Sequence, residues 1–123
     1  MPGWSQAAAL AALDKLIADY PYTKLHIGDP GAAGTANPAV NTARVLGAWS
    51  AAAGSTKANS AEMLWSSAPA AEDPTHFSQW SSAGPAGGNF GASGLITSNA
   101  LAIGDDARFA PGTLVLTAQN VAA

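Results

Sequence analysis

The sequence predicts a mainly β fold, a small antiparallel β-sandwich or barrel with one N-terminal amphipathic α-helix. Two observations lead to this prediction. Large apolar side chains first recur at the helical period of three to four residues, and they then fall into short runs separated by turns rich in Gly and Pro. We expect a single domain in which a lead-in at residues 1–4 precedes a helix at 5–20, a β-sandwich domain at 21–117 and a C-terminal tail at 118–123.

The helix is expected to begin near Gln6 with Ser5 as its N-cap. It is expected to end at Tyr20, because Pro21 disfavours the α conformation in the residue before it. The apolar side chains of this segment recur at steps of three and four, which places them on one stripe. The stripe consists of Leu10, Leu13, Leu16, Ile17 and Tyr20. We interpret the stripe as a face turned to the core, with packing on a neighbouring subunit as the alternative.

The first strand is expected at 22–28, where the side-chain period changes to two. We expect this strand to be half-buried, with His26 on its more polar face. The triplet Asp29-Pro30-Gly31 then predicts a turn, in which the Asp29 side chain supports the backbone. Residues 32–40 are uncharged and have no periodicity, so we expect a surface loop pressed against a neighbouring subunit.

Six further strands are expected where short apolar runs lie between breakers rich in Gly, Pro and Asp. They are 42–50, 57–66, 75–81, 89–97, 100–103 and 113–117. Short strands at this spacing after one helix are the basis for the predicted sandwich or barrel.

Charge and composition disfavour several functions. Only 11% of the 123 residues are charged, against about 25% in a typical soluble domain. The net charge of −3 offers no electrostatic attraction for nucleic acid or for an anionic membrane. We expect no disulfide, signal peptide or membrane span. A surface of small, uncharged side chains loses little entropy when it is covered. Such a surface suits a protein held in an assembly, although a GC-rich genome would also enrich Ala and Gly.

The residues that could carry chemistry do not form a recognisable motif, so we expect no enzyme, no metal and no cofactor. His26 and His76 are fifty residues apart, without carboxylates at ligand-like spacing. We interpret Asp105 and Asp106 as part of a turn that begins at Gly104. The carboxylates available for glycoside chemistry number no more than the background of any domain. They are Glu62, Glu72, Asp73, Asp105 and Asp106.

Tryptophan and the chain ends suggest where contacts with other molecules lie. Trp49, Trp65 and Trp80 fall within expected strands, and we interpret them as core residues, with a sugar-stacking platform as the alternative. The interface candidates come from the lead-in, the helix, the surface loop and the tail. They are Trp4, Leu10, Ala36, Asn37 and Val121.

Four segments of the last hundred residues or so form a recognisable series. They are Leu25-His26-Ile27-Gly28-Asp29-Pro30-Gly31 with Gly34, Asn37 and Ala43-Arg44; Thr75-His76-Phe77-Ser78-Gln79-Trp80; Phe90 to Leu95; and Gly104 to Leu114. In matching order these segments resemble those of a family of small virion proteins from tailed bacteriophages that infect actinobacteria. These proteins are commonly labelled tail-fibre-like or minor structural proteins.

The resemblance implies a small β-sandwich with an N-terminal helical element, no catalysis and a structural place in the phage particle. Our leading hypothesis is a capsid decoration protein. It would be made in the host cytoplasm, lie on the capsid exterior, bind the major capsid protein as a homotrimer and stabilise the shell by mass action. The alternative is a minor tail or tail-fibre module that contacts a host cell-surface glycan through exposed tryptophan faces.

Overall fold

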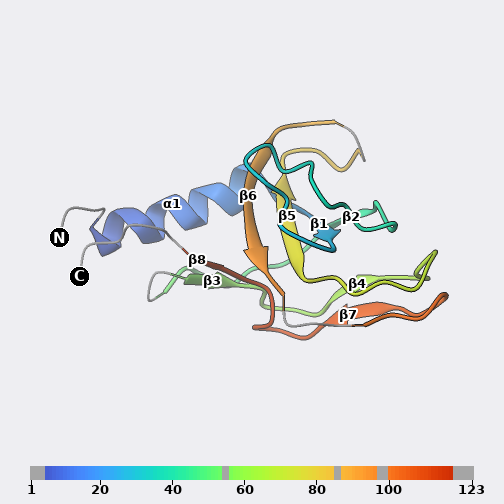
Figure 1. Cartoon of the computed structure of the whole chain (residues 1–123). Coiled ribbons are helices and arrows are strands. Elements are labelled where there is room, and N and C mark those ends of the chain that lie inside the picture. The colour runs from blue at the N-terminus through green and yellow to red at the C-terminus, as the bar shows by residue number, and fades with distance from the viewer. Residues whose placement is uncertain (1–4, 54–55, 85–86, 97–99, 118–123) are drawn as a thin grey trace.

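The computed structural model describes residues 5–53, 56–84, 87–96 and 100–117. It confirms a mainly β protein with one N-terminal helix (Figure 1). In the described residues the strands form three separate antiparallel sheets, so the barrel alternative is wrong. The elements are α1 (Gln6–Asp19), β1 (Tyr22–His26), β2 (Arg44–Leu46), β3 (Thr56–Ala58), β4 (Met63–Trp65), β5 (His76–Trp80), β6 (Phe90–Leu95), β7 (Ala107–Phe109) and β8 (Val115–Thr117).

Helix α1 begins and ends for the reasons that its sequence indicates. The Ser5 hydroxyl accepts a hydrogen bond from the amide of Ala8 at 3.2 Å, which caps the first turn. At the other end the Tyr20 amide donates to the carbonyl of Leu16 at 2.7 Å, and Pro21 follows. Leu13 is buried in the hydrophobic core and Leu16 and Ile17 pack against it, so the interpretation of the stripe as a core-facing seam is confirmed for these three residues.

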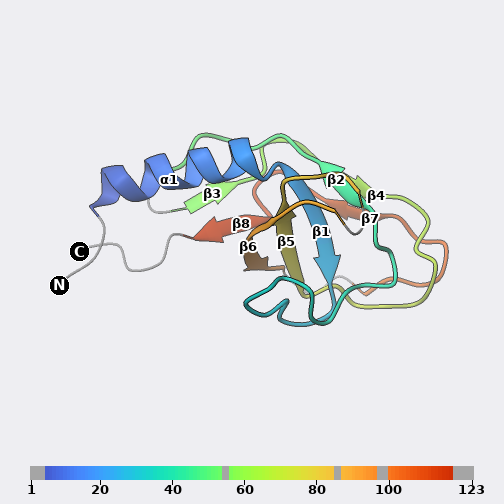
Figure 2. The same cartoon turned by 90° about the horizontal axis from the view of Figure 1, so that it is seen from above.

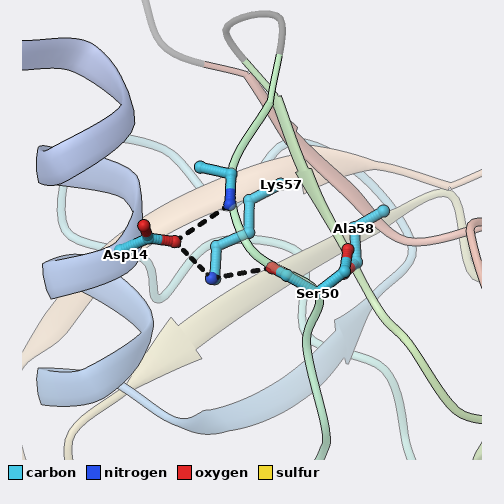
Figure 3. A network of polar contacts seen from close by, with 5 residues as sticks. Asp14, Ser50, Lys57 and Ala58 are labelled. Atoms are coloured by element: carbon cyan, nitrogen blue, oxygen red, sulfur yellow. Dashed lines mark hydrogen bonds and ion pairs between the residues drawn. The ribbon is translucent and has the colours of Figure 1, made fainter. Parts of the chain in front are cut away.

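A polar network fastens α1 to the segment that leads into β3 (Figure 3). The Asp14 carboxylate accepts hydrogen bonds from the Lys57 ammonium at 2.7 Å and from the Ala52 amide at 3.0 Å. Lys57 also donates to the carbonyl of Ser50 at 2.8 Å. Figure 2 shows the result, with α1 running alongside β3 at one side of the molecule.

The four-stranded sheet has the order β2-β1-β5-β6, and every neighbouring pair is antiparallel. Leu25 of β1 lies opposite Phe77 of β5, and both side chains enter the core. The expectation of a half-buried first strand is wrong, because residues 23–26 are all buried. The core covers one face of β1, and part of the loop after β1 covers the other, where His26 bonds to Ala36.

The two smaller sheets pair β3 with β8 and β4 with β7. The single strand expected at 57–66 is wrong, because Asn59 interrupts it. The Asn59 side chain is buried and takes the place of the missing ladder bonds. Its carbonyl oxygen accepts from the amides of Gly112 and Leu114, at 3.1 and 3.0 Å. Its amide group donates to the carbonyls of Ala61, Phe109 and Ala110.

The last strands also differ from the expectation. Residues 100–103 do not form a strand, and Leu101 makes only an isolated bridge to Glu72. β7 instead lies at Ala107–Phe109, between turns at Gly104 and Gly112 that both have positive φ. The residues on both sides of β7 have the composition of turns, and the strand conformation of these three residues depends on β4, their distant partner.

The core lies between the four-stranded sheet and the two smaller sheets, and α1 contributes to it (Figures 1 and 2). Trp65 is 1% exposed and meets Phe109 edge to face, with ring centroids 5.4 Å apart. Trp80 is 7% exposed, and Trp49 is partly buried against Phe77. The prediction of core residues is confirmed for Trp65 and for Trp49, which packs against the core, whereas Trp80 is buried on the opposite face of the sheet, beneath Arg44.

Candidate functional site

One face of the four-stranded sheet gathers the polar residues of its central strands. Antiparallel register puts directly opposed residues on the same face. Lys24 lies opposite Ser78 on β5 and opposite Arg44 on β2, and Tyr22 lies opposite Trp80. Since side chains alternate along a strand, His26 shares this face with Lys24. We call this surface, defined by Lys24, His26, Arg44, Ser78 and Trp80, the polar face.

A chain of hydrogen bonds runs across the polar face to the loop that follows β1. The Trp80 indole N–H donates to the Ser78 hydroxyl oxygen at 2.6 Å. The Ser78 oxygen is 2.7 Å from His26 Nε2, and His26 Nδ1 is 2.9 Å from the carbonyl oxygen of Ala36. A carbonyl oxygen only accepts, so Nδ1 carries the proton and Nε2 of the neutral ring accepts from Ser78. Burial lowers the pKa of His26 below its ordinary value of 6.5.

The loop after β1 is folded on its own sheet. Asp29 accepts a hydrogen bond from the Gly31 amide at 2.9 Å, which confirms its predicted role in the turn. Gly34, with φ of +74°, lies against the Phe90 ring so closely that a Cβ atom would overlap it. Only a residue without a side chain fits this approach.

Between this loop, β2 and the β5–β6 connection lies a hollow of about 490 Å³. We call it the Lys24–Arg44 hollow. Its wall consists of Lys24, Ala33, Thr35, Arg44, Trp80, Gly88, Asn89 and Phe90. No carboxylate is among these described residues, and two of them are cations.

The two cations are held in different ways. The Arg44 guanidinium carbon lies 4.2 Å from the centre of the Trp80 ring, and Nη1 donates to the carbonyls of Ser82 and Gly87 at 3.0 and 2.6 Å. Lys24 is 8% exposed, and its ammonium has no hydrogen-bond or ion-pair partner within the described ranges. Burial, followed by the nearby charge of Arg44, lowers the pKa of Lys24.

A second hollow, of about 480 Å³, has a different lining. Asp29 and His76 line it together with residues of β6 and β8. The Asp29 carboxylate is engaged by the Gly31 amide, and His76 Nδ1 is 2.9 Å from the Thr75 hydroxyl. His76 is also the register partner of His26, which fifty residues of sequence separation do not suggest.

The predicted interface residues have different places in the fold. Leu10 is half-buried on α1. Ala36 and Asn37 are exposed, but both also hold the loop in place, Ala36 through His26 and Asn37 through a bond from its side-chain amide to the Asp29 carbonyl at 3.0 Å. Trp4 and Val121, with the lead-in and the tail, lie outside the described residues. The role of these five residues in contacts between subunits stays a prediction.

The carboxylates considered for catalysis have structural partners. Glu72 accepts from the amides of Val40 and Asn41, and Glu62 pairs with Arg108 at 2.9 Å. Asp105 accepts from the Ala102 amide three residues away, which agrees with the predicted turn. Asp106 instead accepts from the Ser67 amide of a distant segment. Among the residues that the structure describes, no group of three His, Asp or Glu could hold a metal ion, and no helix is long and apolar enough to cross a membrane.

The fold and the polar face define a small β-rich module whose polar residues shape surface hollows. The chain belongs to the family described as Podophage GP4 fiber I protein gp80, whose model matches residues 12–117. No curated protein matches the chain significantly. The match runs from α1 to the end of β8, and therefore covers both hollows.

Family membership makes the chain a phage fibre protein, which is a structural protein of the virion and not an enzyme. The resemblance to phage virion proteins is thereby confirmed at the level of a phage fibre protein. The tail-fibre alternative agrees with this family better than the capsid decoration role does.

Sequence reasoning missed Lys24 and Arg44 as site residues. One signal was available, because Lys24 is a cation inside an apolar alternating segment. The proximity of Arg44 follows only from strand register.

Proposed function

We propose that the chain is a module of a tail fibre that contacts a glycan on the host cell surface. Its membership of a phage fibre family supports this role. The observation that carries the proposal is the Lys24–Arg44 hollow. Its volume falls within the range of about 300–1,000 Å³ that is common for small-ligand sites.

The lining of the hollow suits a sugar better than an apolar ligand. Thr35 and Asn89 offer a hydroxyl and an amide for hydrogen bonds, and Phe90 presents a partly exposed ring. Trp65 and Trp80 are too deeply buried to act as stacking platforms, so the proposed contact is through the hollow and not through exposed tryptophan faces.

Competition for adsorption tests the proposal. Purified full-length protein, added in excess to host cells, is expected to slow adsorption of the phage, and periodate oxidation of the cell-surface glycan is expected to abolish binding of the labelled protein. An adsorption rate that is unchanged at saturating protein would contradict a receptor-contacting role. Hundreds of copies per particle on a stained gel would favour capsid decoration instead, whereas a few dozen or fewer fit a fibre.

Homotrimeric assembly stays a prediction. Large apolar side chains are exposed at both edges of the four-stranded sheet, with Leu46 on β2 64% exposed and Leu95 on β6 71% exposed. Such surfaces are commonly covered in assemblies. The mass of the purified protein in solution, measured by light scattering at several concentrations, checks this prediction.

A further inference from the structure

Lys24 is a buried cation at the wall of an open hollow. It lies on β1, a central strand, and the residue as a whole is 8% exposed, yet its ammonium has no partner within the described part of the chain. The ammonium nitrogen is not among the fully buried unpartnered atoms, so it reaches the solvent at the hollow while the rest of the side chain is covered. A partly desolvated charge of this kind is stabilised by a counter-charge. The hollow is the open side from which a counter-charge can approach.

The positive charge of Arg44 adds to the attraction of this hollow for an anion. Arg44 lies opposite Lys24 in the β1–β2 register, and its positive charge contributes to lowering the pKa of Lys24. The other lining residues are uncharged. An anion that enters the hollow would meet two cations, so its binding would be favoured by both charges.

The arrangement indicates which kind of anion fits. Arg44 Nη1 donates to two backbone carbonyls, and the guanidinium lies over Trp80. We therefore expect Arg44 to attract an anion by its positive charge and not by a bidentate pair of hydrogen bonds. The ammonium of Lys24, with three N–H donors, is therefore the charged group expected to bind the anion directly. One ammonium group suits a singly charged anion. The hydroxyl of Thr35 and the amide of Asn89 suit a ligand rich in hydroxyl groups.

We propose that the Lys24–Arg44 hollow binds the carboxylate of an acidic sugar residue, a uronic acid or a sugar of similar chemistry, with Lys24 as its direct partner. The inference rests on the proposed function, since it names the class of glycan that the fibre module contacts. Arg44 supports the site by its charge and by its stacking on Trp80.

Binding of defined oligosaccharides tests the inference. We would titrate the full chain with trimers of galacturonic acid and of glucuronic acid, and with the methyl esters of both, which keep the shape and lose the charge. Binding of at least one acid is expected, with an affinity on the order of tenfold or more above that of its ester, because a desolvated charge-assisted hydrogen bond is lost. Equal affinity for acid and ester, or no binding of either acid, overturns the inference.

A matched pair of variants locates the site. Lys24→Gln is expected to weaken binding of the acid about as much as esterification does. Lys15→Gln removes the same charge from an exposed position on α1 and is expected to leave binding unchanged. An equal loss of affinity in both variants would mean a general effect of charge and would overturn the assignment of the site to Lys24. The ester comparison needs only the unmodified protein and therefore decides the matter even if Lys24→Gln does not fold.

Two further arms separate this inference from the proposed function and from phosphate binding. If the unmodified protein and Lys24→Gln slow phage adsorption equally, the glycan contact stands and the acidic-sugar site fails. If the unmodified protein does not slow adsorption, the proposed function fails, and the oligosaccharide titration still decides the chemistry of the hollow. Binding of a glycerol phosphate oligomer in preference to both uronic acid trimers would overturn the carboxylate assignment.

Discussion

His26 Nε2 lies 2.7 Å from the hydroxyl oxygen of Ser78, and both residues are fully buried. This contact joins two neighbouring strands on the polar face. Through Nδ1 the same ring holds the carbonyl of Ala36, so one side chain ties the loop after β1 to the sheet. The loop in turn supplies Ala33 and Thr35 to the wall of the Lys24–Arg44 hollow.

The neutral state of His26 makes stability depend on pH. Its pKa is lowered in the folded protein, so below about pH 6.5 the unfolded chain takes up a proton that the folded ring does not. The contribution of the neutral His26 ring to the free energy of unfolding is therefore expected to be complete above about pH 6.5. It should decrease as the pH is lowered from there towards the lowered pKa. Urea unfolding between pH 7.5 and 5 measures this slope.

A substitution isolates the contribution of His26. His26→Asn removes the acceptor of the Ser78 hydroxyl hydrogen and the donor to the Ala36 carbonyl, and is expected to cost about 2 kcal/mol or more at pH 7.5. The variant should also show a smaller loss of stability between pH 7 and 5. The same slope in the variant and the unmodified protein would show that other groups cause the pH dependence.

Asn59 is expected to be a sensitive position in the core. Asn59→Ala leaves the amides of Gly112 and Leu114 and several carbonyls without their side-chain partner, which should destabilise the fold by about 3 kcal/mol. Asn89→Ala, at an exposed position, is the control and should change stability by less than about 0.5 kcal/mol. Chemical denaturation measures both. Similar values for the two variants would contradict the structural role assigned to Asn59.

Gly34 is expected to tolerate no side chain. Gly34→Ala combines a positive φ with overlap on the Phe90 ring, whereas Gly112→Ala has a positive φ and open space. We expect Gly112→Ala to lower the free energy of unfolding by about 1 kcal/mol through backbone strain alone. The decrease for Gly34→Ala should be at least twice as large. Thermal unfolding compares them, and the Phe90 ring signals in an NMR spectrum should move only in Gly34→Ala. Equal losses would mean that the loop does not press on Phe90.

The attachment of α1 is expected to weaken in acid. The hydrogen bond from Lys57, followed by that from the Ala52 amide, lowers the pKa of Asp14 below its ordinary value of 3.8. The contribution of this carboxylate is therefore present above that value and is lost as the pH falls through the lowered pKa. Asp14→Asn should increase hydrogen exchange of the α1 amides at pH 7 and have less effect near pH 3.

Asp19→Asn is the control for the helix attachment. Asp19 also lies on α1, and among the described residues it pairs with Lys15 alone, at an exposed position where such ion pairs contribute little. Its exchange pattern should match that of the unmodified protein. If Asp14→Asn and Asp19→Asn behave alike, the network in Figure 3 does not anchor the helix.

The sequence by itself determined the features that depend on near neighbours. Helix α1 follows from a period of three to four residues, a Ser cap and a Pro stop, which act within a few residues of each other. The strands around Leu25 and Phe77 and the Asp29 turn were predictable for the same reason. The motifs also indicated a phage virion protein.

Tertiary structure alone decided the features that depend on pairing between distant segments. Asn59 divides a predicted strand because its side chain reaches residues about fifty positions away, and β7 exists because β4 pairs with it. Lys24 and Arg44 form one site only through the β1–β2 register. A one-residue change of register would move a strand's side chains to the opposite face. The charge pattern of the hollow is therefore a property of the assembled sheet.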